Sequence, residues 1–245
     1  MTIAHALILS AGKGSRLLPL TADRPKCLID FNGRTLLEWQ LDSLGRNGIT
    51  RVTVVTGFRA DLVDGVVAGR PGVSTLFNPF YHVADNLGSV WLARAAFAQD
   101  TLLLNGDTLV SPALVARVLA GATAPISVTV DEKPDYDSDD MKVWTENGRL
   151  RRIGKTLEPH ETNAESIGLL AFRDGGGAVF ADAVERIMHT PAGTASWYLK
   201  VIDALAAETP IATVPIVGEA WAEVDFPADL DPARALTAGW VAAGL

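Results

Sequence analysis

Short apolar runs alternate with segments of helical periodicity along the first half of this chain. The runs are rich in Leu, Ile and Val and are bounded by turn residues, which is typical of buried strands of a parallel sheet. They cover residues 7–9, 51–56, 73–78 and 101–107. Between them, Leu37, Leu41 and Leu44 mark one face of a helix that ends near Asn47-Gly48. The alternation of strand and helix predicts an α/β fold.

The second half continues the alternation with one irregular segment. The pattern predicts helices near residues 90–97, 113–120, 179–189, 196–207 and 231–243, and strands near 126–130, 169–172, 211–216 and 221–225. A hairpin is predicted about Asn147-Gly148, and Asp231-Pro232 is expected to cap the last helix. We therefore expect one domain over residues 1–245, with a small β insert over residues 131–172.

A glycine-rich turn follows the first apolar run and carries the clearest chemical signal. Gly12 and Gly14 remove side chains where backbone N–H groups would approach anionic oxygens, and Ser15 adds a hydroxyl donor. Arg16 and Lys26 add a forked cation and a point charge. A single residue between the glycines excludes a Walker P-loop, and Leu17 replaces the third glycine of a dinucleotide fingerprint. The segment predicts a polyphosphate site in an extended loop.

Composition narrows the class of protein. The chain has 245 residues, of which 48% are hydrophobic, and its apolar runs are shorter than a membrane span. The single cysteine, Cys27, excludes an internal disulfide, and although Lys26 could lower its pKa, packing is the simpler role. The net charge of −8 argues against a nucleic-acid surface. We expect a soluble cytoplasmic protein with neither nucleic acid nor membrane as a partner.

The pattern AGxGSRLxPLTxxxPKxL over residues 11–28 resembles the signature of nucleotidyltransferases that join a nucleoside triphosphate to a sugar phosphate, choline phosphate or related acceptor. The resemblance implies a Rossmann-like, GT-A-like fold with a mixed, mainly parallel sheet flanked by helices, and a Mg²⁺-dependent reaction. It implies that Arg16 and Lys26 are catalytic, with Arg16 on the leaving pyrophosphate. The resemblance also implies that the nucleotide is bound by residues in and next to this loop, which are Leu9, Ala11, Gly12, Gly14, Ser15 and Arg16.

Two aspartates are the expected metal ligands. Asp107 ends a buried strand beside a glycine, where a hard divalent cation explains a carboxylate better than capping does, because Ser111 and Pro112 already form the start of the next helix. The family resemblance assigns Asp107 to magnesium as well. It also places a second metal-binding aspartate at the end of a late strand, which matches Asp225. Read alone, outward Glu223 and Asp225 would fit an exposed edge strand.

Residues 78–89 form a loop at the carboxyl end of a strand, where open α/β sheets bind ligands. We expect Asn86, Gly88 and Ser89 to recognise the base or ribose, with helix capping by Asp85 or Asn86 as the alternative. The DNxxS arrangement resembles phosphocholine and inositol phosphate cytidylyltransferases. This resemblance favours CTP.

An acidic segment marks the expected acceptor side. Residues 131–140 hold six acids and one lysine, and Tyr136 among them would contact an ammonium-bearing acceptor by charge and cation–π attraction, unless the segment is a solvated loop. The DMKV segment resembles cytidylyltransferases that accept inositol phosphate or phosphonates, which implies that Lys142 holds the acceptor's anion. Glu165 is either an acceptor ligand or a strand-edge residue, and Trp197 either lines the acceptor pocket or packs in the core.

These observations predict transfer of CMP from CTP to a small phosphate- or phosphonate-bearing acceptor with release of pyrophosphate. The alternatives are a thymidylyl- or uridylyltransferase acting on a hexose 1-phosphate, and a nucleotide-sensing regulatory subunit without activity. A glycosyltransferase would require an Asp-x-Asp motif, but residues 105–107 read Asn-Gly-Asp. The sequence does not determine which acceptor is used or whether the chain forms a homodimer.

Overall fold

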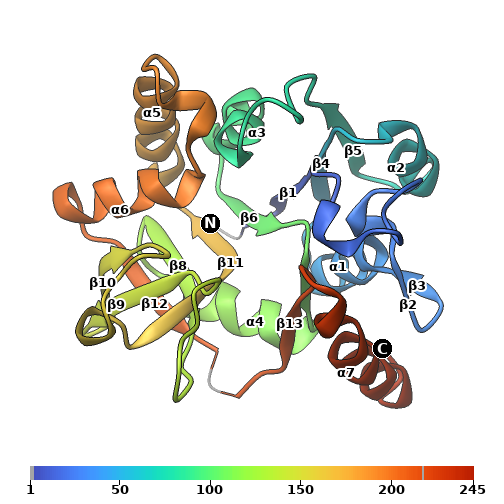
Figure 1. The fold of residues 1–245 in the computed structure, drawn as a ribbon. Helices are drawn as coiled ribbons and strands as arrows, with labels where there is room; N and C mark the ends of the chain where they lie inside the picture. The colour runs from blue at the N-terminus through green and yellow to red at the C-terminus, as the bar shows by residue number, and fades with distance from the viewer. Residues whose placement is uncertain (1–2, 217) are drawn as a thin grey trace.

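A computed structural model describes residues 3–216 and 218–245 and shows a mixed sheet covered by helices on both faces (Figure 1). The sheet has nine strands in the order β5-β4-β1-β6-β11-β8-β12-β10-β9. Its strands are β1 (His5–Ser10), β4 (Arg51–Thr56), β5 (Val73–Phe77), β6 (Thr101–Asn105), β8 (Ile126–Asp131), β9 (Lys142–Glu146), β10 (Arg149–Ile153), β11 (Ala164–Phe172) and β12 (Ala212–Pro215). The Rossmann-like α/β fold is confirmed.

The sheet is parallel on one side and mixed on the other. β5, β4, β1 and β6 pair in parallel, as the alternating sequence pattern predicts. β11 is antiparallel to both β6 and β8, and the hairpin β9–β10, which turns at Asn147-Gly148, extends the same sheet. β11 is also longer than predicted. It begins at Ala164 and continues through Gly168, whose left-handed conformation coincides with a shift of register against β8.

Two apolar cores lie on the two faces of the sheet. One face packs against α3 (Asn86–Leu92), α5 (Gly176–Met188) and α6 (Tyr198–Glu208), with Phe97, Phe172 and Phe180 in mutual contact. The other face packs against α1 (Leu36–Arg46), α2 (Ala60–Val67) and α4 (Pro112–Gly121). Successive side chains of β1 point to opposite faces of the sheet, so Leu7 lies in the first core and Ile8 in the second. Ser111 caps α4 through the Leu114 N–H, as predicted.

Two small sheets complete the fold beside the second core. β2 (Asp30–Phe31) pairs with β3 (Arg34–Thr35), and β7 (Thr108–Val110) pairs with β13 (Trp221–Glu223). The C-terminal helix α7 (Leu230–Ala242) packs beside them, with Trp240 against Trp39 of α1. The pairing of β7 with β13 matters for the site, because it brings residues near 107 and 225 to the same place.

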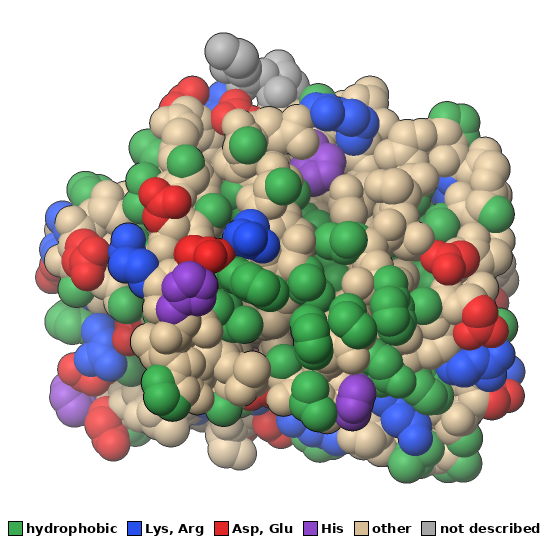
Figure 2. All heavy atoms as spheres, turned by 90° about the horizontal axis from the view of Figure 1, so that it is seen from above, with side chains coloured by type: hydrophobic (Ala, Val, Ile, Leu, Met, Phe, Trp, Pro, Cys, Tyr) green, Lys and Arg blue, Asp and Glu red, His purple; other side chains and the backbone are tan. Residues whose placement is uncertain are grey.

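The face seen from above in Figure 2, on the side of α3 and α5, gathers hydrophobic side chains between scattered charges of both signs. Strand β5 is an edge of the large sheet, and Phe77 at its end is exposed, as are Phe80 and Val83 in the loop that follows.

Among the described residues, every helix is too short or too polar to cross a membrane.

His5, at the start of β1, is expected to make the stability of this fold depend on pH. Its ring nitrogens lie 3.1 Å from the hydroxyls of Thr101 and Thr53, and burial together with the charge of Arg51 lowers the pKa of His5. The unfolded chain therefore binds this proton more readily, so the free energy of unfolding should fall as pH drops below about 6.5. Denaturant titrations of the wild type and His5→Gln at a series of pH values measure this. An equal pH slope in both proteins would contradict it.

Candidate active site

The glycine-rich turn after β1 is shaped so that Lys26 can pack against it. Gly14 has a left-handed conformation (φ 72°), and its carbonyl accepts a hydrogen bond of 2.7 Å from the Thr21 hydroxyl. A Cβ at Gly14 would lie 2.9 Å from Cβ of Lys26, so glycine is needed here for both conformation and space. The turn then continues into a short 3₁₀ helix, Ser15–Leu17, which places Arg16 beside the same site.

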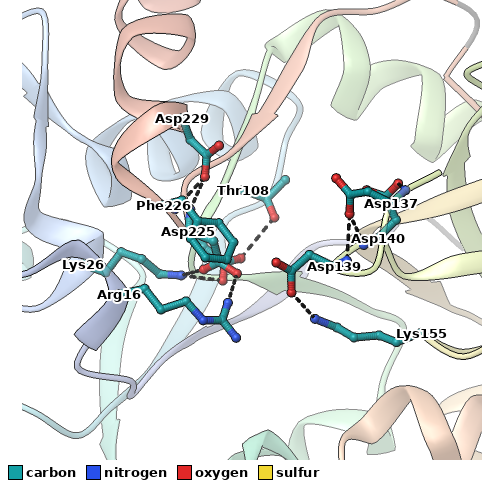
Figure 3. Close-up of polar contacts among 11 residues, drawn as sticks. Arg16, Lys26, Thr108, Asp137, Asp139, Asp140, Lys155, Asp225, Phe226 and Asp229 are labelled. Carbon is teal, nitrogen blue, oxygen red and sulfur yellow. Dashed lines mark hydrogen bonds and ion pairs between the residues drawn. The ribbon is translucent and has the colours of Figure 1, made fainter. Parts of the chain in front are cut away.

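Lys26 and Arg16 converge on two carboxylates from distant parts of the chain (Figure 3). Lys26 Nζ lies 2.9 Å from Oδ2 of Asp107 and also donates to Oδ1 of Asp225, and Arg16 Nη1 lies 2.9 Å from Oδ2 of Asp225. Burial opposes the charged form of Lys26, but the two carboxylates outweigh it and raise the pKa of Lys26. Burial is likewise outweighed at Asp225, where Lys26 and Arg16 lower the pKa. Lys26 and Asp225 are therefore both charged at neutral pH.

Asp107 is presented by a tight turn between β6 and β7. The turn approaches β1 closely, since the Gly106 N–H bonds to the Leu9 carbonyl at 2.9 Å and a Cβ on Gly106 would lie 2.3 Å from that oxygen. Gln40 of α1 is fully buried and donates to the carbonyls of Asn105 at 2.7 Å and Thr108 at 2.8 Å. These contacts fix the backbone on both sides of Asp107.

Asp225 follows strand β13 and is fixed by an aspartate one turn later. Asp229 accepts hydrogen bonds from the backbone N–H groups of Asp225 at 2.8 Å and Phe226 at 2.7 Å. The predicted cap at Asp231 was wrong: α7 begins at Leu230 after Asp229, and Asp231 instead pairs with Arg234. The hydrogen bonds to Asp229 hold the backbone at Asp225, and the Asp225 carboxylate faces Lys26 and Arg16.

Glu223 adds a third carboxylate that the sequence did not single out as a ligand. Oxygens of Asp107, Glu223 and Asp225 lie within 4.8 Å of one another, the single such group found among the described residues. Loss of hydration in the cleft and the two neighbouring carboxylates raise the pKa of Glu223. Three carboxylates so close together are a donor set that fits a hard divalent cation such as Mg²⁺. The signal available in the sequence was the two-residue spacing of Glu223 and Asp225 within residues 221–225, which the pattern predicts as a strand.

A cleft of about 170 Å³ opens beside these carboxylates. Arg16, Asp107 and Asp225 line one side, and Asn86 and Trp197 contribute other parts of its wall. Lys155, which the sequence pattern does not single out, also lines the cleft, and it lies directly after β10 in a Gly-Lys-Thr segment. The cleft therefore has cations on both sides of a carboxylate cluster.

The structure separates the predicted nucleotide-reading residues. Asn86 lines the cleft, and its Oδ1 accepts the backbone N–H of Tyr198 at 3.0 Å, which ties α3 to α6 rather than capping α3. Ser89 is buried and its hydroxyl accepts a hydrogen bond from Asn78, so it faces the protein interior. Gly88 is buried as well, and a Cβ at this position would lie 3.0 Å from Cβ of Ala84. In the first loop, Gly12 and Ser15 are exposed, whereas Ala11 is buried and Leu9 half-buried.

On the predicted acceptor side, Lys142 turns away from the cleft. Its Nζ donates to the carbonyls of Asp137 and Lys155, so it stabilises the backbone of the acidic loop. Trp197 does line the cleft, but its ring already faces two cations, Lys155 and Lys200, each 5.5 Å from the ring centre. The cation nearest the site on this side is therefore Lys155 rather than Lys142.

Glu165 and Tyr136 meet around a lysine of the acidic loop. Glu165 is buried, and its Oε2 lies 3.0 Å from Nζ of Lys133, which also reaches Asp140 at 2.8 Å and lies over the Tyr136 ring. Burial raises the pKa of Glu165 to about 7, although Lys133 opposes the shift. The carboxylates of Glu165 and Asp140 and the ring of Tyr136 therefore surround the ammonium group of Lys133.

Cys27 packs in the core beneath the site. Its side chain is buried, and burial raises the pKa of the thiol to about 12, which outweighs the neighbouring Lys26. The thiolate form is therefore suppressed, in agreement with a packing role and against the lowered pKa that adjacency to Lys26 suggested.

The site lies where β1 and β6 of the α/β sheet end. It combines a glycine-rich turn, two cations and a carboxylate cluster, which is the arrangement expected of an enzyme that handles nucleotides. Residues 6–135 match the MobA-like NTP transferase domain, and the chain belongs to this family. It is a nucleotidyltransferase.

Relatives support this assignment over nearly the whole chain. CTP:phosphoglutamine cytidylyltransferase of Campylobacter jejuni is 24% identical and aligns over 93% of this chain and 98% of its own length. CMP-5'-(3-aminopropyl)phosphonate synthase of Streptomyces rubellomurinus is 30% identical over 92% of this chain, which spans only 37% of that protein. The fold resembles inositol-1-phosphate CTP transferase of T. maritima, with a TM-score of 0.79, 22% identity and coverage of 94% and 92% of the two chains. It equally resembles CTP:phosphocholine cytidylyltransferase of Streptococcus pneumoniae, with a TM-score of 0.79, 18% identity and coverage of 97% and 100%.

Proposed function

We propose that this enzyme transfers CMP from CTP to a small acceptor that carries a phosphate or phosphonate, with release of pyrophosphate and dependence on Mg²⁺. The observation that carries the proposal is the convergence of Arg16, which follows the glycine-rich turn, and Lys26, which packs against that turn, on Asp107 and Asp225. The names of the relatives support CTP as the nucleotide, since three of them are named cytidylyltransferases and a fourth is named for a CMP-linked phosphonate as its product.

The chemistry requires no nucleophile from the protein. An oxygen of the acceptor's phosphate or phosphonate attacks the α-phosphorus of CTP, and the bond from that phosphorus to the pyrophosphate oxygen breaks. Both reactants are anions, so the protein contributes charge and orientation. Lys26 steadies the reacting phosphoryl group, and Arg16 with the backbone N–H groups of the turn binds the leaving pyrophosphate. Asp107 and Asp225, with Glu223 beside them, would hold Mg²⁺, which neutralises phosphate charge when it is bound.

Lys155 is the residue best placed to receive the acceptor's anion. It lines the same cleft as Asp107 and Asp225, and it comes from the opposite wall to Arg16. The assignment replaces Lys142, whose ammonium is bound to backbone carbonyls of the acidic loop. An acceptor held by Lys155 would direct its oxygen toward a nucleotide held by Arg16 and Lys26.

An ammonium group on the acceptor would find its partners at Glu165 and Asp140, where Lys133 now lies. Several relatives are named for acceptors with a cationic nitrogen, including 2-aminoethylphosphonate and choline phosphate. Because burial raises the pKa of Glu165 to about 7, its charged form increases as pH rises through that value.

This position of Glu165 gives a pH prediction for binding of the acceptor. The KM for 2-aminoethylphosphonate should fall as pH rises from about 6 to about 8, because ionised Glu165 attracts the ammonium. In Glu165→Gln the KM should be higher and this pH dependence weaker, whereas the KM for CTP should change little. Steady-state assays of both proteins across the pH range measure this. An unchanged pH profile in the variant would contradict the role of Glu165.

A matrix of nucleotides and acceptors tests the proposed function. Pyrophosphate release is measured with CTP, UTP, dTTP and GTP, each against phosphocholine, 2-aminoethylphosphonate, inositol 1-phosphate and glucose 1-phosphate. We expect turnover with CTP and at least one phosphate or phosphonate acceptor other than the hexose. Preference for UTP or dTTP with glucose 1-phosphate would identify the hexose-activating alternative, and nucleotide binding without turnover would identify a regulatory subunit.

A further inference from the structure

The loop between β8 and β9 carries a carboxylate into the acceptor side of the cleft (Figure 3). Oδ1 of Asp139 lies 3.3 Å from Nζ of Lys155, with half of the Asp139 side chain and a quarter of the Lys155 side chain exposed. Both residues line the cleft that Asp107 and Asp225 bound on its other side. A carboxylate of the chain itself therefore pairs with the cation that faces the reacting groups.

The conformation of this loop is held by contacts that do not involve the Asp139 carboxylate. The Asp139 backbone N–H donates to Oδ1 of Asp137 at 2.7 Å, and the Asp137 N–H donates to Oδ2 of Asp140 at 2.7 Å. Lys133 then binds Asp140 and Glu165 and ties the loop to β11. Each of these contacts uses a group other than the Asp139 carboxylate, whose own partner among the described contacts is Lys155. The side chain can therefore leave Lys155 while the loop keeps its hydrogen bonds.

We propose that Asp139 is an internal competitor for the acceptor's anion at Lys155 and so sets the apparent affinity of the enzyme for its acceptor. The inference rests on the proposed function, because it requires that Lys155 receive the phosphate or phosphonate. A phosphate or phosphonate carries more charge than a carboxylate and offers more acceptor oxygens, so it displaces Asp139. The contact between Asp139 and Lys155 is exposed, and exposed ion pairs are weak enough to exchange readily.

Competition of this kind has a defined kinetic consequence. The fraction of enzyme in which Lys155 is free divides the intrinsic dissociation constant, so the internal pair raises the apparent constant for the acceptor. Removal of the Asp139 charge should therefore improve binding of the acceptor, which is the opposite of what a substrate-binding acid would show. The size of the effect follows from the strength of an exposed ion pair, about two- to five-fold.

The test is a steady-state comparison of wild type, Asp139→Asn and Asp135→Asn, each with 2-aminoethylphosphonate or, if it is the better substrate, phosphocholine. Asp139→Asn should lower the KM for the acceptor about two- to five-fold, with kcat and the KM for CTP nearly unchanged. Asp135 is exposed in the same loop, so Asp135→Asn removes the same charge away from Lys155 and should leave the KM for the acceptor as in wild type.

A second background tests whether the effect acts through Lys155. In Lys155→Met the KM for the acceptor should rise, and adding Asp139→Asn should then give no further improvement, because the shared partner is absent. An unchanged or higher KM in Asp139→Asn, or an equal improvement in the Lys155→Met background, would overturn the inference while leaving the proposed function intact. A wild-type enzyme that releases no pyrophosphate with any acceptor would overturn the proposed function and the inference with it.

Discussion

Replacement of Asp107 with Asn is expected to lower kcat/KM by about two to four orders of magnitude while the fold is retained. The carboxylate of Asp107 faces Lys26 and belongs to the three-carboxylate group that fits a divalent cation. An amide of the same size keeps the turn, because the contacts of Gln40 with Asn105 and Thr108 use backbone carbonyls. It removes the charge that would hold Mg²⁺ against the triphosphate. The measurement is pyrophosphate release with CTP over a titration of MgCl₂.

A matched variant separates this effect from a general change of charge. Asp64 lies exposed on α2, and Asp64→Asn should have wild-type activity and the same Mg²⁺ requirement. Far-UV circular dichroism and thermal unfolding should show that both variants are folded. If Asp107→Asn turned over within about three-fold of the wild type at every Mg²⁺ concentration, Asp107 could not be a ligand of a required metal.

Replacement of Lys26 with Met should affect activity and stability in ways that metal can separate. The Lys26 ammonium lies between Asp107 and Asp225, so its loss leaves neighbouring carboxylates without their counter-charge. We expect a loss of about two to three orders of magnitude in kcat, because a cation at the reacting phosphoryl group is missing. Without Mg²⁺ we also expect a destabilisation of about 1–3 kcal/mol from the unpaired charges.

Addition of Mg²⁺ should restore much of the stability of Lys26→Met but little of its activity. A divalent cation can replace the missing charge between Asp107 and Asp225, whereas it cannot replace a flexible ammonium at the reacting phosphate. Thermal unfolding with and without MgCl₂ measures the first effect, and the Mg²⁺-dependent rise in Tm should exceed that of the wild type. Equal rises in both proteins would contradict competition of Lys26 with a cation for the same carboxylates.

The α/β fold and the glycine-rich turn of the site could be predicted, because both are specified by residues that are close together in the sequence. The apolar runs at 7–9, 51–56, 73–78 and 101–107 correspond to β1, β4, β5 and β6, although β5 is an edge strand whose side chains are half-buried or exposed. The glycines and the arginine of the segment 12–16 lie close together in the sequence, so this part of the site is visible without the tertiary structure. The approach of Asp107 and Asp225 was inferred from a family resemblance, and the reason for it is the pairing of β7 with β13. That pairing joins short strands more than a hundred residues apart, and their sequences contain no periodic signal long enough to reveal it.

The acceptor side could not be predicted to the same depth, because side-chain direction there depends on tertiary contacts. Lys142 and Lys155 are both single lysines near strands, and only the fold of the acidic loop turns the first toward backbone carbonyls and the second toward the cleft. Ser89 lies on a helix face directed toward Asn78, which the DNxxS spacing does not reveal. Glu165 reads as a strand residue, and its partner Lys133 comes from an irregular loop without periodicity.

The central claim is that CMP passes from CTP to an acceptor at the cleft between Arg16 and Lys155. The most direct test is incubation of the enzyme with CTP labelled at the α-phosphorus, MgCl₂ and either 2-aminoethylphosphonate or phosphocholine, followed by separation of the products. We expect the label to appear in a CMP-linked acceptor in amounts equal to the pyrophosphate released. The claim would be contradicted if the label stayed in CTP or appeared only as free CMP, or if UTP or dTTP with a hexose 1-phosphate formed product in its place.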